Sequence, residues 1–168
     1  PYAGPGEYGI AGDGGPATDS YLAEPEGLHL DDDGTLYIAD RNNSRVAVVD
    51  EDGTIDTLAG GRFFDDRPDS DALSSPGDVA IGPDGEVLVL DDGELVQLED
   101  DGSATMLSAD SSDCYPDVAD EPAETCSLDE VDLSAYRMAF APDGTLWVSD
   151  AEQVLRIVDG EVEVAVQL

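Results

Sequence analysis

The sequence has no lysine and only six arginines, against 41 aspartates and glutamates in 168 residues. The resulting formal net charge of −35 would repel the phosphates of nucleic acids and the headgroups of anionic membranes, so we expect neither as a partner. No apolar run approaches the roughly 18 residues that a membrane-spanning helix needs, so we expect no membrane insertion. So large a charge is typical of a solvated surface in a salt-rich habitat or of a secreted protein.

Histidine and cysteine are also scarce. The single histidine, His29, has no partner for nucleophile-and-base chemistry, and we interpret it as a packed or channel-lining strand residue. The two cysteines, Cys114 and Cys126, lie in a polar stretch without the spacing of a metal site. We predict a disulfide between them that closes a surface loop, which favours an oxidising, extracellular or cell-surface location.

A pattern of about fifty residues repeats three times. The turn glycines Gly34, Gly85 and Gly144 lie 51 and 59 residues apart, and Asp40, Asp91 and Asp150 keep the same intervals. Each copy shows β-branched or apolar runs separated by turns such as "DDDG" and "DEDG". Asp-Gly turns supply the positive φ of tight hairpins, so the copies read as four-stranded antiparallel sheets.

Stacked repeats of this kind favour one all-β architecture over another. Strands such as "TLYIA", "EVLVL" and "TLWVS" are apolar at nearly every position, as expected of sheets covered on both faces. A β-propeller, in which each blade covers its neighbours, satisfies this pattern. A two-sheet sandwich is the competing architecture, but it does not require three copies of one four-strand unit.

The repeat also resembles a known family. "GDGGPAT" at 12–18, followed by "PEGL", "DGTLYIAD", "NNSRV" and "GTIDTLAG", is similar to the NHL-repeat β-propellers of bacterial surface proteins and related extracellular proteins. The resemblance implies about six blades in a closed ring. Approximate blades at 25–60, 76–107 and 135–168, with 1–4 as the end of an upstream blade and 108–133 as an acidic, cysteine-containing insertion, make about half of it. The remaining blades would come from the same longer chain or from a second copy.

Binding residues are expected where long loops meet. In a propeller, the crossovers between blades share one rim with the turns between the second and third strands, and loops on a rigid scaffold commonly carry function. The residues predicted to form this binding rim are Asp40, Asn42, Asn43, Asp91, Asp113, Asp117, Asp120, Glu121 and Asp150.

Two functions follow as alternatives. The first is an extracellular, non-catalytic binding or scaffold module whose partner, a protein or glycan, is cationic. The second, implied by resemblance to six-bladed lactonases, is a metal-dependent hydrolase with calcium in the channel and Asp40, Asp91 and Asp150 as candidate ligands. The acidic turn strings lack the spacing of an EF-hand loop, and no motif of a nucleophile or a phosphate-binding loop appears. The binding module is therefore the leading hypothesis.

Overall fold

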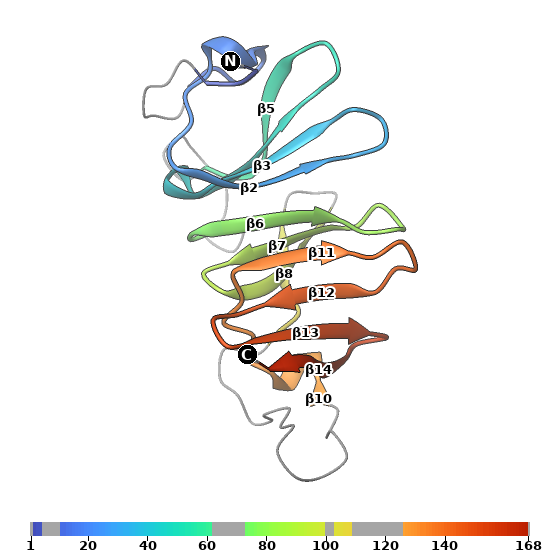
Figure 1. Ribbon diagram of the computed structural model, residues 1–168. Helices are drawn as coiled ribbons and strands as arrows, with labels where there is room; N and C mark the ends of the chain where they lie inside the picture. Colours follow the sequence, from blue (N-terminus) through green and yellow to red (C-terminus); the bar gives the residue numbers. More distant parts are fainter. Residues whose placement is uncertain (1, 5–10, 62–72, 100–102, 109–125, 168) are drawn as a thin grey trace.

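The computed structural model describes residues 2–4, 11–61, 73–99, 103–108 and 126–167. These residues form three antiparallel sheets that follow one another through the molecule (Figure 1). The predicted all-β propeller architecture, with about three blades present, is thereby confirmed. No helix in the described part of the chain has the length and apolarity needed to cross a membrane.

The first blade has the strand order β1-β5-β4-β3-β2. Its strands are β1 (Gly15–Pro16), β2 (Pro25–Leu30), β3 (Leu36–Asp40), β4 (Arg45–Val49) and β5 (Thr54–Gly60). The second blade has the order β6-β7-β8-β9. Its strands are β6 (Pro76–Ile81), β7 (Val87–Asp91), β8 (Glu94–Leu98) and β9 (Ala104–Met106). The third blade has the order β10-β14-β13-β12-β11. Its strands are β10 (Cys126–Ser127), β11 (Arg137–Phe140), β12 (Leu146–Ser149), β13 (Gln153–Val158) and β14 (Glu161–Gln167).

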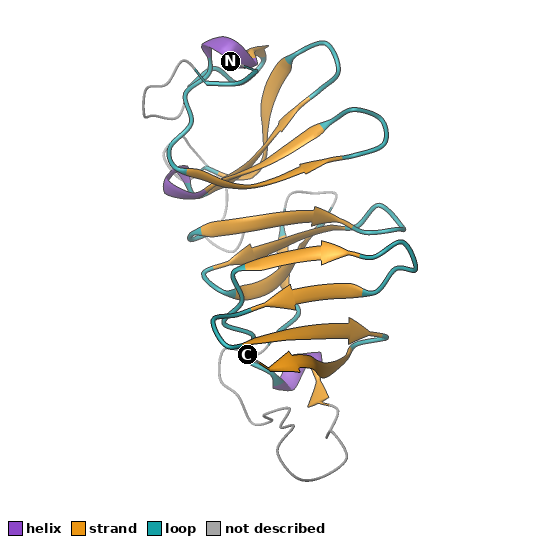
Figure 2. Cartoon of the chain, in the orientation of Figure 1, coloured by secondary structure: helices purple, strands orange, loops and turns teal. Residues whose placement is uncertain are grey.

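Two short edge strands, β1 and β10, were not expected from the sequence. Gly15 pairs with Ile55 at the outer edge of the first blade, and Cys126 pairs with Val162 at the outer edge of the third. Each is followed by a single 3-10 turn, η1 (Ala17–Asp19) or η4 (Leu128–Glu130), shown in purple in Figure 2. Residues 15–16 and 126–127 therefore pair with the outer edge of their blades before the chain reaches the inner strands β2 and β11.

The acidic strings form the tight hairpins that the sequence predicts. In "DDDG", the Asp31 carboxylate accepts hydrogen bonds from the backbone of Asp33 at 3.1 Å and of Thr35 at 2.8 Å, while Gly34 has φ +87°. In "DEDG", Asp50 accepts from the Thr54 backbone in the same way, at 2.8 Å. Aspartate and glycine recur at these positions because the side chain caps the turn and glycine adopts positive φ without strain.

The inner strands β2, β6 and β11 run side by side in the same direction (Figure 1). The first residues of these strands lie at one end of the blades. The 3-10 turn η2 (Arg41–Asn43) and the β7–β8 and β12–β13 turns lie at the same end. We call this end the crossover rim and define it as residues 23–26, 40–45, 73–77, 91–94, 134–137 and 149–153. The opposite end, the hairpin rim, comprises the turns at 31–35, 50–54, 82–86, 141–145 and 158–161.

Apolar side chains fill the space between successive blades. Val46, Ala59, Val79 and Val89 belong to the core between the first two blades. Leu90, Met138, Leu146 and Leu155 belong to the core between the second and the third. Both faces of the central blade are thus buried, which explains why its strands read as nearly continuous apolar runs.

The outward faces of the two end blades differ. On the first blade, Leu28 and Leu30 are 61% and 64% exposed, although Ile38 on the same face is buried. On the third blade, Arg156 pairs with Glu163, and its cross-strand neighbour on the other side is Trp147. One end of the blade stack is therefore apolar and the other is mixed.

Candidate functional site: the crossover rim

A buried ion pair organises the crossover rim in the first blade. Asp40, at the end of β3, and Arg45, at the start of β4, both have 0% exposed side chains, and Arg45 Nε donates to Asp40 Oδ2 at 2.8 Å. Asp40 also accepts hydrogen bonds from the Asn43 side chain at 2.7 Å and from the Ala23 backbone at 2.7 Å. Both carboxylate oxygens of Asp40 are therefore engaged within the protein.

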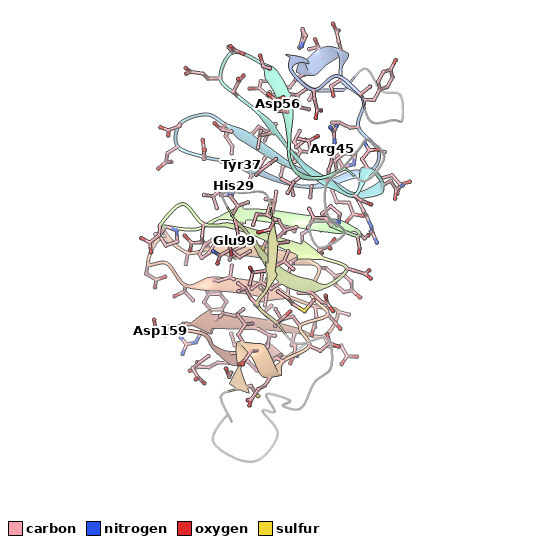
Figure 3. The ribbon with its side chains drawn as sticks, turned by 180° about the vertical axis from the view of Figure 1, so that it is seen from behind. His29, Tyr37, Arg45, Asp56, Glu99 and Asp159 are labelled. Carbon is pink, nitrogen blue, oxygen red and sulfur yellow. The ribbon has the colours of Figure 1, made fainter. Side chains whose placement is uncertain are left out.

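The other end of Arg45 holds the crossover against the blade. Its Nη1 donates to Asp13 Oδ1 and to Thr57 Oγ1, both at 2.9 Å, and its Nη2 donates to the Tyr21 carbonyl at 3.0 Å. Every nitrogen of the guanidinium thus has a partner, as a buried charge requires. Figure 3 shows Arg45 at the crossover end of the first blade and Asp159 at the hairpin end of the third. Sequence reasoning did not single out Arg45, although an arginine at a strand start in so arginine-poor a chain was a signal.

Asp91 and Asp150 occupy the equivalent positions in the other blades and cap backbone instead. Asp91 accepts hydrogen bonds from the backbone N–H groups of Ser74, at 2.8 and 3.0 Å, and of Ser75, at 2.6 Å. Asp150 Oδ1 accepts from the backbone of Glu152 at 2.6 Å and of Gln153 at 2.7 Å. All three repeat aspartates therefore position the chain at the end of a second strand.

The structure does not bring Asp40, Asp91 and Asp150 together as metal ligands. In the ranges that the structure describes, no group of three or more histidine, cysteine, aspartate or glutamate side chains has an arrangement that could hold a metal ion. Each of the three carboxylates instead bonds to groups of its own blade or crossover.

The remaining predicted rim residues divide into two groups. Asn43 is 4% exposed and takes part in the Asp40 network, whereas Asn42 is exposed and its backbone N–H donates to the Ala23 carbonyl at 3.0 Å. The predicted positions that lie outside the described residues are Asp113, Cys114, Asp117, Asp120 and Glu121. Cys126 is buried and is not a free thiol, but its disulfide with Cys114 stays a prediction.

A second carboxylate, Asp78, lies buried between the inner strands. Its Oδ2 accepts a hydrogen bond from the backbone of Met138 on β11 at 2.9 Å, so it links the second blade to the third. On the other side, a Cβ added to Gly27 would lie 2.2 Å from Asp78 Oδ1 and 2.5 Å from Asp78 Cα. Burial raises the pKa of Asp78, against the lowering effect of its backbone hydrogen bonds. In the sequence, the only sign of this carboxylate is that the second repeat reads "PGD" at 76–78, where the first repeat reads "PEG" at 25–27.

Glu26, Arg41 and Arg137 form a more exposed group at the starts of the inner strands. Arg41 Nη1 lies 2.5 Å from Glu26 Oε1, and Arg137 Nη1 from the third blade lies 3.7 Å from Glu26 Oε2. The hydrogen bond from Arg41 is the main cause that lowers the pKa of Glu26, with a smaller contribution from the Arg137 charge. Sequence reasoning missed this group because its members come from different blades.

His29 packs against an aromatic ring, as a strand residue. Its ring centroid lies 6.3 Å from that of Tyr37 on the neighbouring strand, with the two planes at 68° (Figure 3). This is an edge-to-face contact between cross-strand partners. Burial raises the pKa of the Tyr37 hydroxyl, and the charges of Asp31 and Asp33 raise it further.

Sequence comparison places these blades in a family. The family model described as the teneurin NHL domain matches residues 3–162, which is nearly the whole chain. The chain belongs to the teneurin NHL-domain family. Teneurin-m of Drosophila melanogaster is 42% identical to the chain over 59 residues, a segment that is 35% of this chain and 2% of that protein. The predicted NHL-repeat relationship is thereby confirmed.

Solved structures support the same fold for this NHL domain. A gluconolactonase from Xanthomonas campestris superposes with a TM-score of 0.58 at 19% identity, over 88% of this chain and 48% of that one. A catalytically inactive virginiamycin B lyase from Staphylococcus aureus, solved with quinupristin, gives a TM-score of 0.55 at 15% identity, over 86% and 43%. At these identities the likeness shows the fold alone. The chain spans less than half the length of either structure and a small fraction of Teneurin-m.

Proposed function

We propose that this NHL-type propeller segment is an extracellular, non-catalytic binding or scaffold module that contacts its partner through the crossover rim. The observation that carries the proposal is the Asp40–Arg45 network, which fixes the crossover at 11–24 to the blade through side chains that are fully buried. A surface held in one conformation loses little entropy on binding, which is what a recognition surface needs. The cell-surface setting is inferred from the similarity to Teneurin-m.

The charge of the chain supports a cationic protein or glycan as the partner. Exposed acids on the crossover rim include Glu24, Asp92 and Glu152, and the chain as a whole carries a formal charge of −35. A surface of one sign raises the local concentration of opposite charges and speeds their association. The partner's specificity would then come from contacts with the rigid rim rather than from charge alone.

Two charge-matched variants separate rim binding from diffuse attraction. The first carries Glu24→Gln, Asp92→Asn and Glu152→Gln on the crossover rim. The second carries Asp32→Asn, Glu51→Gln and Asp84→Asn, which replace three exposed acids on the hairpin rim. Each variant loses three negative charges, so their net charges are equal. Neither set includes a carboxylate to which the structure gives a hydrogen bond.

Peptides selected from a random library on the wild-type chain provide the ligand. We expect basic peptides whose affinity falls about tenfold or more in the crossover-rim variant and less than about twofold in the hairpin-rim variant, since each lost ionic contact contributes up to about 1 kcal/mol. Equal losses in the two variants would show that attraction is diffuse. The hydrolase alternative is tested in parallel: a lactone-hydrolysing activity that Asp91→Asn or Asp150→Asn abolishes would overturn the non-catalytic proposal.

We also propose that further blades of the same longer chain cover the two end faces. The apolar face with Leu28 and Leu30 is the kind of surface that a neighbouring blade buries, and similar solved structures are about twice as long as this chain. Sedimentation of the 168-residue segment should show self-association that Leu28→Asp reduces and that Met106→Asp, on an outer strand, does not. A compact monomer at high concentration would contradict this proposal.

A further inference from the structure

Two exposed arginines from different blades meet at the starts of the inner strands. Arg41 belongs to η2 of the first blade and Arg137 to β11 of the third, and their side chains are 43% and 55% exposed. Both guanidinium groups face the single carboxylate of Glu26, on opposite oxygens. In a chain with only six arginines and no lysine, this convergence brings two of the six cationic side chains to one place on the surface.

Arg137 is held in place by backbone on one side of its guanidinium. Both of its hydrogen bonds leave from Nη1, to the Gly77 carbonyl at 3.2 Å and to the Tyr136 carbonyl at 2.7 Å. Within the described residues, Nε and Nη2 have no hydrogen-bond partner. These two nitrogens form the edge of the guanidinium that can donate two parallel hydrogen bonds to the oxygens of a carboxylate.

Arg41 is anchored by side chains instead. Its Nε donates to Ser75 Oγ at 2.8 Å and its Nη1 donates to Glu26. Glu26 therefore balances mainly Arg41, at 2.5 Å, while Arg137 at 3.7 Å lies outside hydrogen-bond distance of it. Arg137 is thus an exposed cation whose ion pair with Glu26 is long, and its Nε and Nη2 edge stays open within the described part of the chain.

We propose that the free edge of Arg137, beside Arg41, is a binding site for a carboxylate group of a protein partner. The chemical class follows from the geometry, because a fixed and planar fork matches two coplanar oxygens better than a spherical ion. The site accounts for one contact on the crossover rim and does not depend on the overall charge of the partner. Its affinity for a protein rests on the proposed binding at the crossover rim, whereas a small carboxylate such as acetate tests Arg137 separately from the rest of the rim.

The surrounding acids limit how strongly a free anion binds. Glu26 lies next to the site, Asp78 is buried below it, and the charges of Glu24 and Asp92 act on Arg41. Their repulsion makes the site weak for a small ion in solution. A carboxylate carried on a protein surface overcomes it, since other contacts of the same surface hold that carboxylate at the rim.

The arginine side chains themselves report binding. Six arginines give six Nε–H signals in a nitrogen–proton correlation spectrum, and those of Arg137 and Arg156 are assigned from the variants Arg137→Lys and Arg156→Lys. The probe is sodium acetate, compared with sodium chloride at the same ionic strength. Arg156 is the matched control, because its Nε already donates to Glu163 at 2.7 Å.

We expect acetate to shift the Arg137 signal saturably while the Arg156 signal hardly moves. In Glu26→Gln, the acetate concentration at half-saturation should fall about fivefold, the effect of removing one unit charge about 4 Å away in water. Equal and linear shifts of both signals would overturn the proposal, as would a chloride effect as large as that of acetate. An Arg137 signal that acetate leaves unchanged in both backgrounds would also overturn it.

Discussion

Replacing Asp40 with asparagine tests the role assigned to the buried network most sharply. The change keeps the shape of the side chain but removes the charge that faces Arg45, and both side chains have 0% exposure. Whichever oxygen the NH₂ group replaces, it faces donors, because the Ala23 backbone donates to Oδ1 and the side chains of Asn43 and Arg45 donate to Oδ2. Arg45 then keeps only Asp13 as an acidic partner.

The expected cost follows from how buried ion pairs behave. Removing one member of such a pair costs about 3–5 kcal/mol, because the other charge stays buried without full compensation. For a domain of this size, each kcal/mol lowers the midpoint of thermal unfolding by roughly 2–4 °C. We therefore expect Asp40→Asn to lower the midpoint by about 10 °C or more.

Glu163→Gln is the matched control, since it removes the acid of the exposed Arg156–Glu163 pair, whose side chains are 47% and 35% exposed. Exposed pairs contribute about 0–1 kcal/mol, so this variant should unfold within about 4 °C of the wild type. Thermal unfolding followed by circular dichroism compares the three proteins. Equal midpoints for Asp40→Asn and Glu163→Gln would refute the view that the Asp40–Arg45 pair organises the crossover.

Four further predictions concern the inner strands, the charge and the cysteines. Gly27→Ala should lower the free energy of unfolding by about 1–3 kcal/mol, because its Cβ would overlap Asp78, whereas Gly77→Ala, with its nearest neighbour at 3.9 Å, should have a much smaller effect in the same denaturation assay. Burial raises the pKa of Asp78, so the stability that this carboxyl contributes is fully present below its unfolded pKa of about 3.9 and is lost as the pH rises through the folded pKa. Asp78→Asn does not titrate, so urea denaturation should show the wild type losing stability relative to this variant as the pH rises above about 4; a constant difference would contradict the shift. Molar sodium chloride should raise the unfolding midpoint, because screening shortens the range of repulsion among 41 acids from about 30 Å at 0.01 M salt to about 3 Å at 1 M, and a flat response would show that repulsion does not limit stability. Reduction of the predicted Cys114–Cys126 disulfide should cost about 3 kcal/mol and leave the strand content unchanged in far-ultraviolet circular dichroism; an unchanged unfolding midpoint on reduction would argue against the bridge.

The blades were predictable because their signals are local and repeated. The Asp-Gly turns and the apolar runs determine hairpins within a few residues of each other, and the 51- and 59-residue intervals show that one unit recurs. The edge strands β1 and β10 were not predictable in the same way. Each contains only two residues, and each exists because the crossover pairs with an outer strand about 35–40 residues further along the chain.

The candidate site was predictable only in part. Asp40, Asp91 and Asp150 were correctly placed at strand ends by their spacing, but the sequence could not show that Asp40 pairs with a buried arginine while the other two cap backbone N–H groups. The contact between Glu26 and Arg137 joins the first blade to the third, so it depends on how the blades stack rather than on any local pattern.

Hydrogen–deuterium exchange with a selected basic peptide bound shows whether the chain recognises its partner through the crossover rim. If it does, binding slows the exchange of backbone amides at 23–26, 41–45, 73–77 and 91–94, and leaves the hairpin turns at 31–35, 50–54 and 82–86 unchanged. Protection confined to the hairpin rim, or spread equally over both rims, would contradict it.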